Sequence, residues 1–570
     1  MSGDIQIKNC QISEEKKELL LEVQGKLSGQ NMGDKLRLSA FFEGRNCDRR
    51  YPVIARCMKT PEGTTSFTAS ARIELENIFF EYQSGQEENI SLQFSYCDLK
   101  DQWIIFDKKI LLPAKLFEKE KREKSIRKRL SCKIAYIFYT FFLPVWLLDG
   151  YLACKGFRKL HPAASGMHGK KAVLYHAHGI VYERTGYGYS LREMKTNYFK
   201  KQYEKACKKS SQTEGVLFLS ERRVEKGGNL DLLRNRMKQS KLCTVMEFLT
   251  TRPVHKLKWK ELRRSARMAA KARVIVLEDF YPQLHALSIR PETKVVQMWH
   301  ACGAFKLFGL SEIGLLEHLK QSTRNHRNYT AALASSPGVA PFYSEAFGVP
   351  ESHIKPIGVP RTDIFFNAEY KTKIANELYE KYPVCKGKRI VLFAPTFRGS
   401  GNKTAYFPQE KFPVNEVMKA LPEDIVLIIK NHPFVNQTCF VEEVYRNRVL
   451  DLSVQENIND LLFITSLLVT DYSSVIFEAS LLNIPMLFYA FDLQEYLEQR
   501  NLYFDFPSFV PGRIVETVEE LILTIIKELD NTRTVEEQEK YKEFRQFFLE
   551  SLDGNSTERA VELIWQLYQQ

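Results

Sequence analysis

Two sets of short apolar runs, separated by longer polar stretches, constrain the fold of this 570-residue chain more than any other feature. Short buried strands that alternate with helical stretches are typical of parallel, doubly wound sheets. We therefore predict an α/β fold with two Rossmann-like domains, over residues 161–368 and 369–570. The first set of runs is 216–219, 274–277 and 295–298, and the second set is 389–393, 425–429, 467–470 and 486–489.

A different pattern precedes these two sets. Residues 1–115 contain short alternating runs separated by Gly, Asn and Asp, which predicts a small antiparallel β-sandwich. We find no catalytic constellation in this region and interpret it as an accessory domain. The alternating runs are 18–23, 36–42, 65–75, 90–96 and 103–110.

Residues 116–160 combine a basic stretch with an apolar one. Lys and Arg dominate residues 119–133, and residues 134–148 are almost entirely apolar. Those residues would form a helix of about 22 Å, which is shorter than the roughly 30 Å hydrocarbon core of a bilayer. Pro144 would also interrupt the helix. The pattern favours a segment that lies on an anionic leaflet; the alternative is a buried helix beside a solvated charge run.

The chain has 82 Lys and Arg against 69 Asp and Glu, a net charge of +13, which suits nucleic acid, an anionic membrane or a polyanionic substrate. Nucleic acid is the least favoured of these partners because no zinc-finger, bZIP or RRM signature is present. The eleven scattered cysteines include no CxxC pair, and the N-terminus lacks a secretory pattern. We therefore expect a reducing, cytoplasmic environment. The oligomeric state is left open.

Two histidines follow predicted strands, one in each set. His300 lies in the segment 297–306, which also holds Lys306, and His432 follows the run 425–429 together with Lys430. Ligands of such sheets bind beyond the carboxyl ends of the strands. Histidine is suited to general-base catalysis because its ordinary pKa is near 6.5. A single strand-end histidine is more often structural, but two in facing domains predict a shared interdomain site.

Further strand ends carry groups that suit phosphate. Asp471, Ser473 and Ser474 lie between a predicted strand and a helix, and free N–H groups at a helix start bind phosphate. Arg398 follows the run 389–393, and a guanidinium can bind two phosphate oxygens at once. The chain has neither GxGxxG nor a P-loop, which disfavours NAD and P-loop enzymes. His176 and His178 lack further metal ligands nearby, so we expect no metal and no cofactor.

Together these motifs resemble the CDP-glycerol glycerophosphotransferase family, the teichoic acid primases and polymerases of Gram-positive bacteria. The strongest match is 461–478 and its continuation to 496. The WH…GxxK, GxPRxD, APTFR and KNHP segments accompany it, and the resemblance covers roughly residues 210–530. It implies a GT-B-like pair of domains and a peripheral, monotopic protein on the cytoplasmic face of the cell membrane.

The resemblance also implies roles for individual residues. It makes His300 the catalytic base and His432 a catalytic histidine at the donor pyrophosphate. It implies an acceptor or phosphate contact for Lys306 and Arg361. The WHA form of the first motif resembles that of ribitol-phosphate transferases and some primases, so both glycerol and ribitol stay open. The donor-binding residues it implies are Arg398, Lys430, Asp471, Ser473, Ser474 and Glu478.

The implied reaction moves a polyol phosphate from a CDP-polyol to a hydroxyl group and releases CMP. The acceptor would be a lipid-linked molecule, carried on undecaprenyl diphosphate, or a growing polymer. Two alternatives stay open: a GT-B glycosyltransferase that uses a nucleotide sugar, and a non-enzymatic membrane-binding adaptor.

Overall fold

The protein is described by a computed structural model that covers two long stretches of the chain. The predicted basic and apolar segment at 116–160 lies outside the described residues, as do His176 and His178. No helix in the described stretches is both long enough and apolar enough to cross a bilayer. The described residues are 3–112, with gaps at 14–17, 29–34, 45–46, 60–63, 75–89, 98–102 and 106–109, and 191–570, with gaps at 210–212, 222–227, 254–255, 313–325, 327, 400–403, 436, 438, 500–501 and 531–532.

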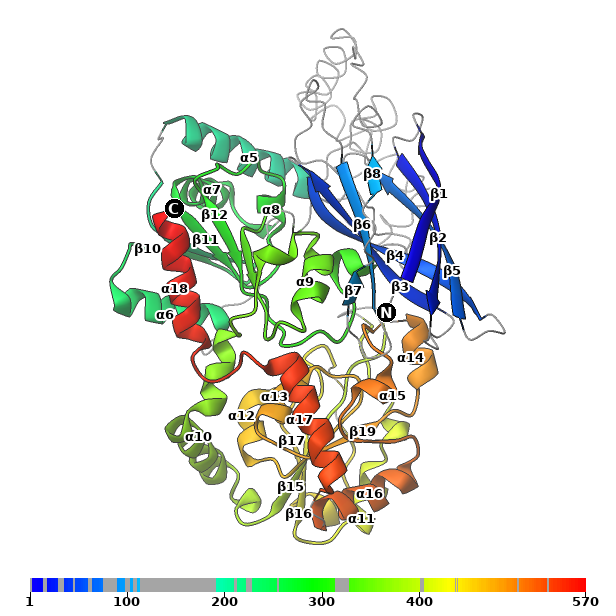
Figure 1. Cartoon of the computed structure of the whole chain (residues 1–570). Coiled ribbons are helices and arrows are strands. Elements are labelled where there is room, and N and C mark those ends of the chain that lie inside the picture. Colours follow the sequence, from blue (N-terminus) through cyan, green and yellow to red (C-terminus); the bar gives the residue numbers. More distant parts are fainter. Residues whose placement is uncertain are drawn as a thin grey trace, which may run out of the picture.

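The N-terminal strands form one antiparallel sheet in the order β1-β2-β5-β4-β3-β6-β7, with β8 also paired to β6 (Figure 1). Alternate residues of β2, namely Leu19, Leu21 and Val23, are buried, because successive side chains of a strand point to opposite faces. The predicted β-rich region is therefore present, but its arrangement as a sandwich is not confirmed. The strands are β1 (Gly3–Ser13), β2 (Glu18–Ser28), β3 (Lys35–Gly44), β4 (Cys47–Lys59), β5 (Thr64–Glu74), β6 (Ile90–Cys97), β7 (Trp103–Ile105) and β8 (Ile110–Leu112).

The first predicted set of runs forms a six-stranded parallel sheet in the order β10-β9-β11-β12-β13-β14. The strand order reverses between β9 and β11, and such a switch point opens a crevice at the carboxyl ends of the strands. The strands are β9 (Val216–Ser220), β10 (Val245–Leu249), β11 (Val274–Leu277), β12 (Lys294–Gln297), β13 (Ala331–Leu333) and β14 (Ile354–Lys355). The helices are α5 (Leu191–Lys209), α6 (Asn229–Ser240), α7 (Trp259–Lys271), α8 (Pro282–His285) and α9 (Ala340–Phe347).

The second set forms another six-stranded parallel sheet, in the order β17-β16-β15-β18-β19-β20, with its switch point between β15 and β18. The predicted pair of parallel α/β sheets is thus confirmed. The strands are β15 (Arg389–Ala394), β16 (Ile425–Ile429), β17 (Val449–Asp451), β18 (Leu467–Thr470), β19 (Met486–Tyr489) and β20 (Arg513–Val515). The helices are α10 (Ala368–Lys381), α11 (Val414–Ala420), α12 (Ile458–Leu461), α13 (Val475–Leu481), α14 (Leu493–Gln499), α15 (Phe506–Phe509), α16 (Val518–Asp530), α17 (Val535–Leu549) and α18 (Ser556–Gln569).

The last helix crosses back to the first sheet. In Figure 1, α18 lies beside α6 on the first α/β domain. Its buried residues Ala560, Val561 and Ile564 share a hydrophobic cluster with Val216 of β9 and Val276 of β11. The predicted unit 369–570 therefore contributes its final helix to the core of the preceding unit. The domain boundaries themselves stay predictions.

Candidate active site

His300 follows β12 and is oriented by an unusual backbone turn at the preceding residue. Trp299 has a φ of +57°, a left-handed conformation that is costly for a residue with a bulky side chain. Two fully buried amides hold it there. The Trp299 N–H donates to Gln297 Oε1 at 2.9 Å, and Asn229 Nδ2 donates to the Trp299 carbonyl at 2.8 Å. The strained turn directs the chain sharply away from the strand just before His300.

The imidazole of His300 lies against a buried carboxylate that the sequence interpretation missed. Its Nδ1 is 2.9 Å from Asp279 Oδ1, a close polar contact whose geometry is not that of an aligned hydrogen bond in this conformation. The His300 side chain is 29% exposed and that of Asp279 only 5%. Asp279 lies two residues after the end of β11, so a carboxylate near a strand end was the available signal.

Asn229, at the first position of α6, joins three segments of this crevice. Its backbone N–H donates to Glu278 Oε1 at 3.2 Å, and its Nδ2 holds the Trp299 carbonyl. Its Oδ1 accepts from the Arg361 N–H at 2.8 Å. One buried amide therefore fixes the relative positions of the ends of β11 and β12 and of the 360–366 turn. Nothing in the sequence pattern distinguished this asparagine from an ordinary helix start.

Arg361 lies between the two α/β domains rather than at an open acceptor site. Its guanidinium forms an ion pair with Glu478 of α13, and its Nη2 is 3.6 Å from Cys302 Sγ. Burial lowers the pKa of the guanidinium, but the Glu478 charge and hydrogen bond outweigh that effect and raise it above its ordinary value. Glu478 and Arg361 thus bind each other in this conformation, and their roles as a donor ligand and a phosphate contact stay predictions.

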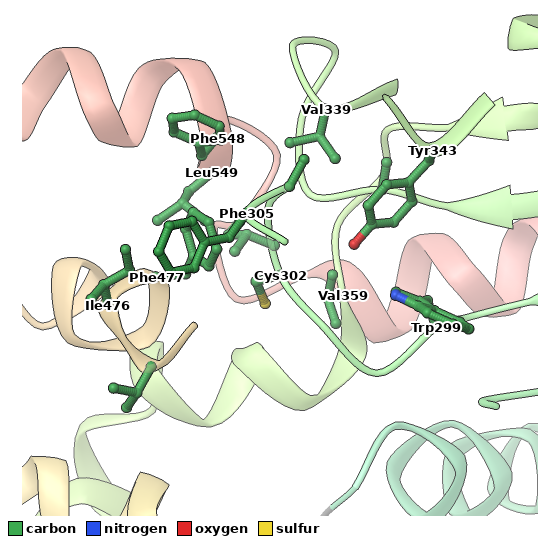
Figure 2. Packing of buried hydrophobic residues seen from close by; sticks show 14 of the residues in the cluster. Trp299, Cys302, Phe305, Val339, Tyr343, Val359, Ile476, Phe477, Phe548 and Leu549 are labelled. Atoms are coloured by element: carbon green, nitrogen blue, oxygen red, sulfur yellow. The ribbon is translucent and has the colours of Figure 1, made fainter. Parts of the chain in front are cut away.

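The His300 loop also packs tightly on α13. Figure 2 shows Trp299, Cys302 and Phe305 of this loop in one cluster with Phe477 of α13. Gly303, between them, has a φ of +62°, and a Cβ placed on it would lie 2.3 Å from the Phe477 ring. Glycine is required here both by the backbone conformation and by the close approach.

Gly303→Ala is therefore expected to lower the free energy of unfolding by about 1–3 kcal/mol, through left-handed strain and overpacking. The midpoint of urea denaturation measures this effect. Gly387→Ala is the matched control, because Gly387 also has a positive φ (+72°) but nothing lies within 4 Å of its added Cβ. An equal loss in both variants would show that the Phe477 contact contributes nothing.

Arg398 and Asp471 are buried partners of each other, and their roles as donor ligands stay predictions. Arg398 Nη1 donates to Asp471 Oδ2 at 2.9 Å, and its Nε and Nη2 bind the two oxygens of Asp492 at 2.6 and 2.8 Å. Asp471 Oδ1 also accepts from the backbone N–H groups of Thr396 and Tyr472. This network ties the loops after β15, β18 and β19 together at the second switch point, and in it one guanidinium is shared by two carboxylates.

Lys430 is buried and binds the backbone of a neighbouring loop. Its Nζ donates to the Ser453 carbonyl at 2.6 Å, and the residue is 9% exposed. Burial lowers the pKa of its ammonium group, and the charges of Asp451 and Glu456 oppose that shift. The ammonium thus holds the loop that follows β17, and its role as a donor contact stays a prediction.

His432, Ser473 and Ser474 remain compatible with their predictions. His432 is partly exposed between the rings of Phe397 and Phe434, and its Nδ1 accepts from the Phe434 N–H at 3.2 Å. Ser473 is partly exposed and Ser474 exposed, immediately before α13. The Ser473 hydroxyl accepts from the Val475 N–H at 3.4 Å. Their roles as donor contacts stay predictions.

Lys306 connects the His300 loop to the second domain. It pairs as a β-bridge with Leu502, and its Nζ lies 5.5 Å from the centre of the Tyr496 ring. Its side chain is partly exposed at this junction.

Within the described stretches, no group of three or more His, Cys, Asp or Glu side chains is arranged to hold a metal ion.

Residues 201–566 match the family described as CDP-Glycerol:Poly(glycerophosphate) glycerophosphotransferase. The match spans more than half of the chain. The chain belongs to this family. The resemblance that its motifs indicated is thereby confirmed. Both six-stranded parallel sheets lie within the matched residues.

Curated relatives of this family member include both ribitol and glycerol proteins. The teichoic acid poly(ribitol-phosphate) polymerase of Bacillus spizizenii is 35% identical over 66% of this chain and 60% of the relative. The teichoic acid ribitol-phosphate polymerase TarK of Staphylococcus aureus is 37% identical over 61% of this chain and 67% of the relative. The teichoic acid glycerol-phosphate primase of Bacillus subtilis is 30% identical over 55% of this chain and 77% of the relative. The chain thus spans about three fifths to two thirds of the two ribitol relatives.

A solved structure supports the fold. The wall teichoic acid polymerase TagF superposes with a TM-score of 0.54 at 20% identity, covering 70% of this chain and 97% of that chain. The two parallel α/β sheets of this family member are thus arranged in a GT-B-like fold.

Proposed function

We propose that this protein transfers a polyol phosphate from a CDP-polyol to a hydroxyl group of a teichoic acid acceptor and releases CMP. The observation that carries the proposal is His300, a partly exposed histidine set against the buried Asp279 carboxylate at the first switch point of a family member. Histidine is the side chain that most often acts as the general base for a hydroxyl group.

We propose ribitol as the transferred polyol. Four curated relatives named for ribitol phosphate are 35–38% identical to this chain, whereas four named for glycerol phosphate are 28–30% identical. The Trp299-His300-Ala301 form of the first motif agrees with that grouping. As a donor precedent, TagF was solved after a soak with CDPG.

The chemistry is a displacement at phosphorus. Asp279 holds the Nδ1 side of the imidazole, so Nε2 of His300 takes the proton from the acceptor hydroxyl. The acceptor oxygen bonds to the β-phosphorus of the CDP-polyol as the bond to the bridging oxygen breaks, and CMP leaves with the bonding electrons. Catalysis of such transfers rests on positioning and on charge neutralisation. His432, Lys306 and the N–H groups beside Ser473 and Ser474 are the proposed neutralising groups, and Arg398 with Asp471 holds their loops.

Asp279→Asn is expected to lower kcat by about 10²-fold with little change in KM, because an amide can hold the wrong tautomer of His300 without altering substrate binding. Steady-state rates of CMP release measure both constants. Asp231→Asn, on an outer turn of α6 where Asp231 pairs with Arg234, is the control. A rise in KM at constant kcat would contradict the positioning role.

We propose that the acceptor is lipid-linked, on undecaprenyl diphosphate, and that the protein works at the cytoplasmic membrane face. The support is the basic stretch at 119–133 followed by the apolar stretch at 134–148. Flotation with anionic liposomes tests this placement. A protein lacking residues 119–148 that floats as well as the full chain would contradict it.

Donor profiling tests the function directly. The purified protein is incubated with acceptor and CDP-ribitol, CDP-glycerol or UDP-sugars in parallel, and nucleotide release is measured. We expect CMP release to be fastest from CDP-ribitol. Release of UDP would favour the glycosyltransferase alternative, and release from no donor, with binding to liposomes intact, would favour the adaptor.

A further inference from the structure

A cavity of about 340 Å³ lies in front of the second switch point, between the loops that follow β15 and β19. One wall is a two-stranded turn in which Arg398 and Tyr406 exchange backbone hydrogen bonds at 2.7 and 3.1 Å. The opposite wall is the start of α14, with Asp492, Glu495 and Tyr496. Among the residues that line the cavity, only Arg398 has a predicted ligand contact, at the donor phosphate.

The cavity combines aromatic rings with fixed polar groups. Tyr406 is 47% exposed, so its ring is available to a ligand. The Arg398 guanidinium lies 5.1 and 5.2 Å from the ring centres of Phe491 and Tyr496, and it binds Asp492 through two hydrogen bonds. The floor is therefore rigid. Binding sites for small molecules have this composition, with apolar surface and a few convergent polar groups.

The charged side chains around the cavity indicate which class of ligand it can bind. Glu410, Asp492 and Glu495 line it, with Asp471 behind them, and the cations of Arg398 and Lys411 are fewer than these carboxylates. An ionised carboxylate only accepts hydrogen bonds. The cavity therefore lacks the net positive charge that favours phosphate or a nucleotide diphosphate, and it offers acceptors to a neutral molecule that carries several hydroxyl groups.

We propose that this cavity binds the neutral polyol moiety of a substrate, a linear chain of hydroxyl-bearing carbons. The proposal rests on the proposed function. It adds that the anionic phosphate and the polyol are recognised by separate parts of the second domain. Lys306, whose ammonium lies over the Tyr496 ring that forms one wall, marks the side on which the adjoining phosphate would lie. The polyol can belong to the donor or to the terminal unit of the acceptor.

The test uses Glu495→Gln and Tyr406→Ala in the full chain, with Glu416→Gln on α11 as the matched control. Glu495 and Glu416 are both exposed, and only the first lines the cavity. We expect each cavity variant to raise the KM of one polyol substrate about 10-fold, the effect of losing one hydrogen bond to a charged group or an equivalent contact. A rise for CDP-ribitol identifies the donor, and a rise for the acceptor identifies the polymer end; either supports the proposal.

Inhibition by CMP separates a polyol site from a nucleotide site, because CMP carries no polyol. We expect its inhibition constant to be unchanged in both cavity variants. A CMP constant that rises together with the KM of CDP-ribitol would overturn the proposal in favour of a cytidine site, and unchanged constants for every substrate would overturn it altogether.

Saturation-transfer NMR with free ribitol supplies a readout that does not need turnover. If ribitol receives signal from the wild type but not from Glu495→Gln, the cavity assignment is supported. This result does not depend on turnover of any donor, so a failure of the proposed function is recognised separately. Equal transfer in the wild type and Glu495→Gln, or none in either, overturns the cavity assignment.

Discussion

His300→Ala is expected to lower kcat by about 10² to 10⁴-fold, the usual contribution of a general base, while the affinity for the CDP-polyol stays within about twofold. The reason is positional. The imidazole lies beside the first switch point, where it contacts Asp279 and is still 29% exposed, so its removal leaves the packed core intact. The reacting proton is on the acceptor, so the donor keeps its own contacts in the second domain.

Single-turnover CMP release and calorimetric titration of CDP-ribitol measure these two quantities. His353→Ala is the matched control, because His353 is a partly exposed histidine of the same domain that bonds to the Tyr329 carbonyl, outside the candidate site. Near-normal turnover in His300→Ala would refute the general-base assignment. Loss of donor binding would instead move His300 into the donor site.

Glu478→Gln is expected to lower the free energy of unfolding by about 3–5 kcal/mol, because it leaves the Arg361 guanidinium buried beside a neutral group. The two side chains are 15% and 5% exposed, and they join the 360–366 turn to α13 across the two domains. Burial of an unpaired cation costs far more than the pair itself contributes.

Urea denaturation followed by tryptophan fluorescence measures the loss. Glu539→Gln breaks an exposed ion pair with Lys542 and is expected to cost less than about 1 kcal/mol. If Glu478→Gln does not fold, the double variant Arg361→Met with Glu478→Leu is expected to recover, since it removes both charges. A midpoint for Glu478→Gln equal to that of Glu539→Gln would contradict the buried-pair argument.

The sequence predicts the strands well because buried parallel strands appear as continuous apolar runs. The runs at 216–219, 274–277, 389–393 and 425–429 all lie within strands of the two sheets. The same argument locates His300 correctly after β12, since a motif that follows a strand must lie at the carboxyl edge of its sheet.

The partners of the site residues could not be predicted in the same way. Arg398 meets Asp471 because β15 pairs with β18, and that strand order depends on the whole domain. The sequence shows an arginine suited to phosphate but not the two carboxylates that already bind it. His300 meets Asp279 for the same reason, through the pairing of β11 with β12.

Because α18 returns to the first sheet, the first α/β domain cannot complete its core before the second domain has been synthesised. Val216 and Val276 are covered by Ala560, Val561 and Ile564, residues that the ribosome adds only after the whole second domain. During synthesis this apolar face of the first sheet stays uncovered until α18 is made. Transiently exposed apolar surface of this kind promotes chaperone binding and aggregation. The core of the first domain is thus completed only after the second domain has been synthesised.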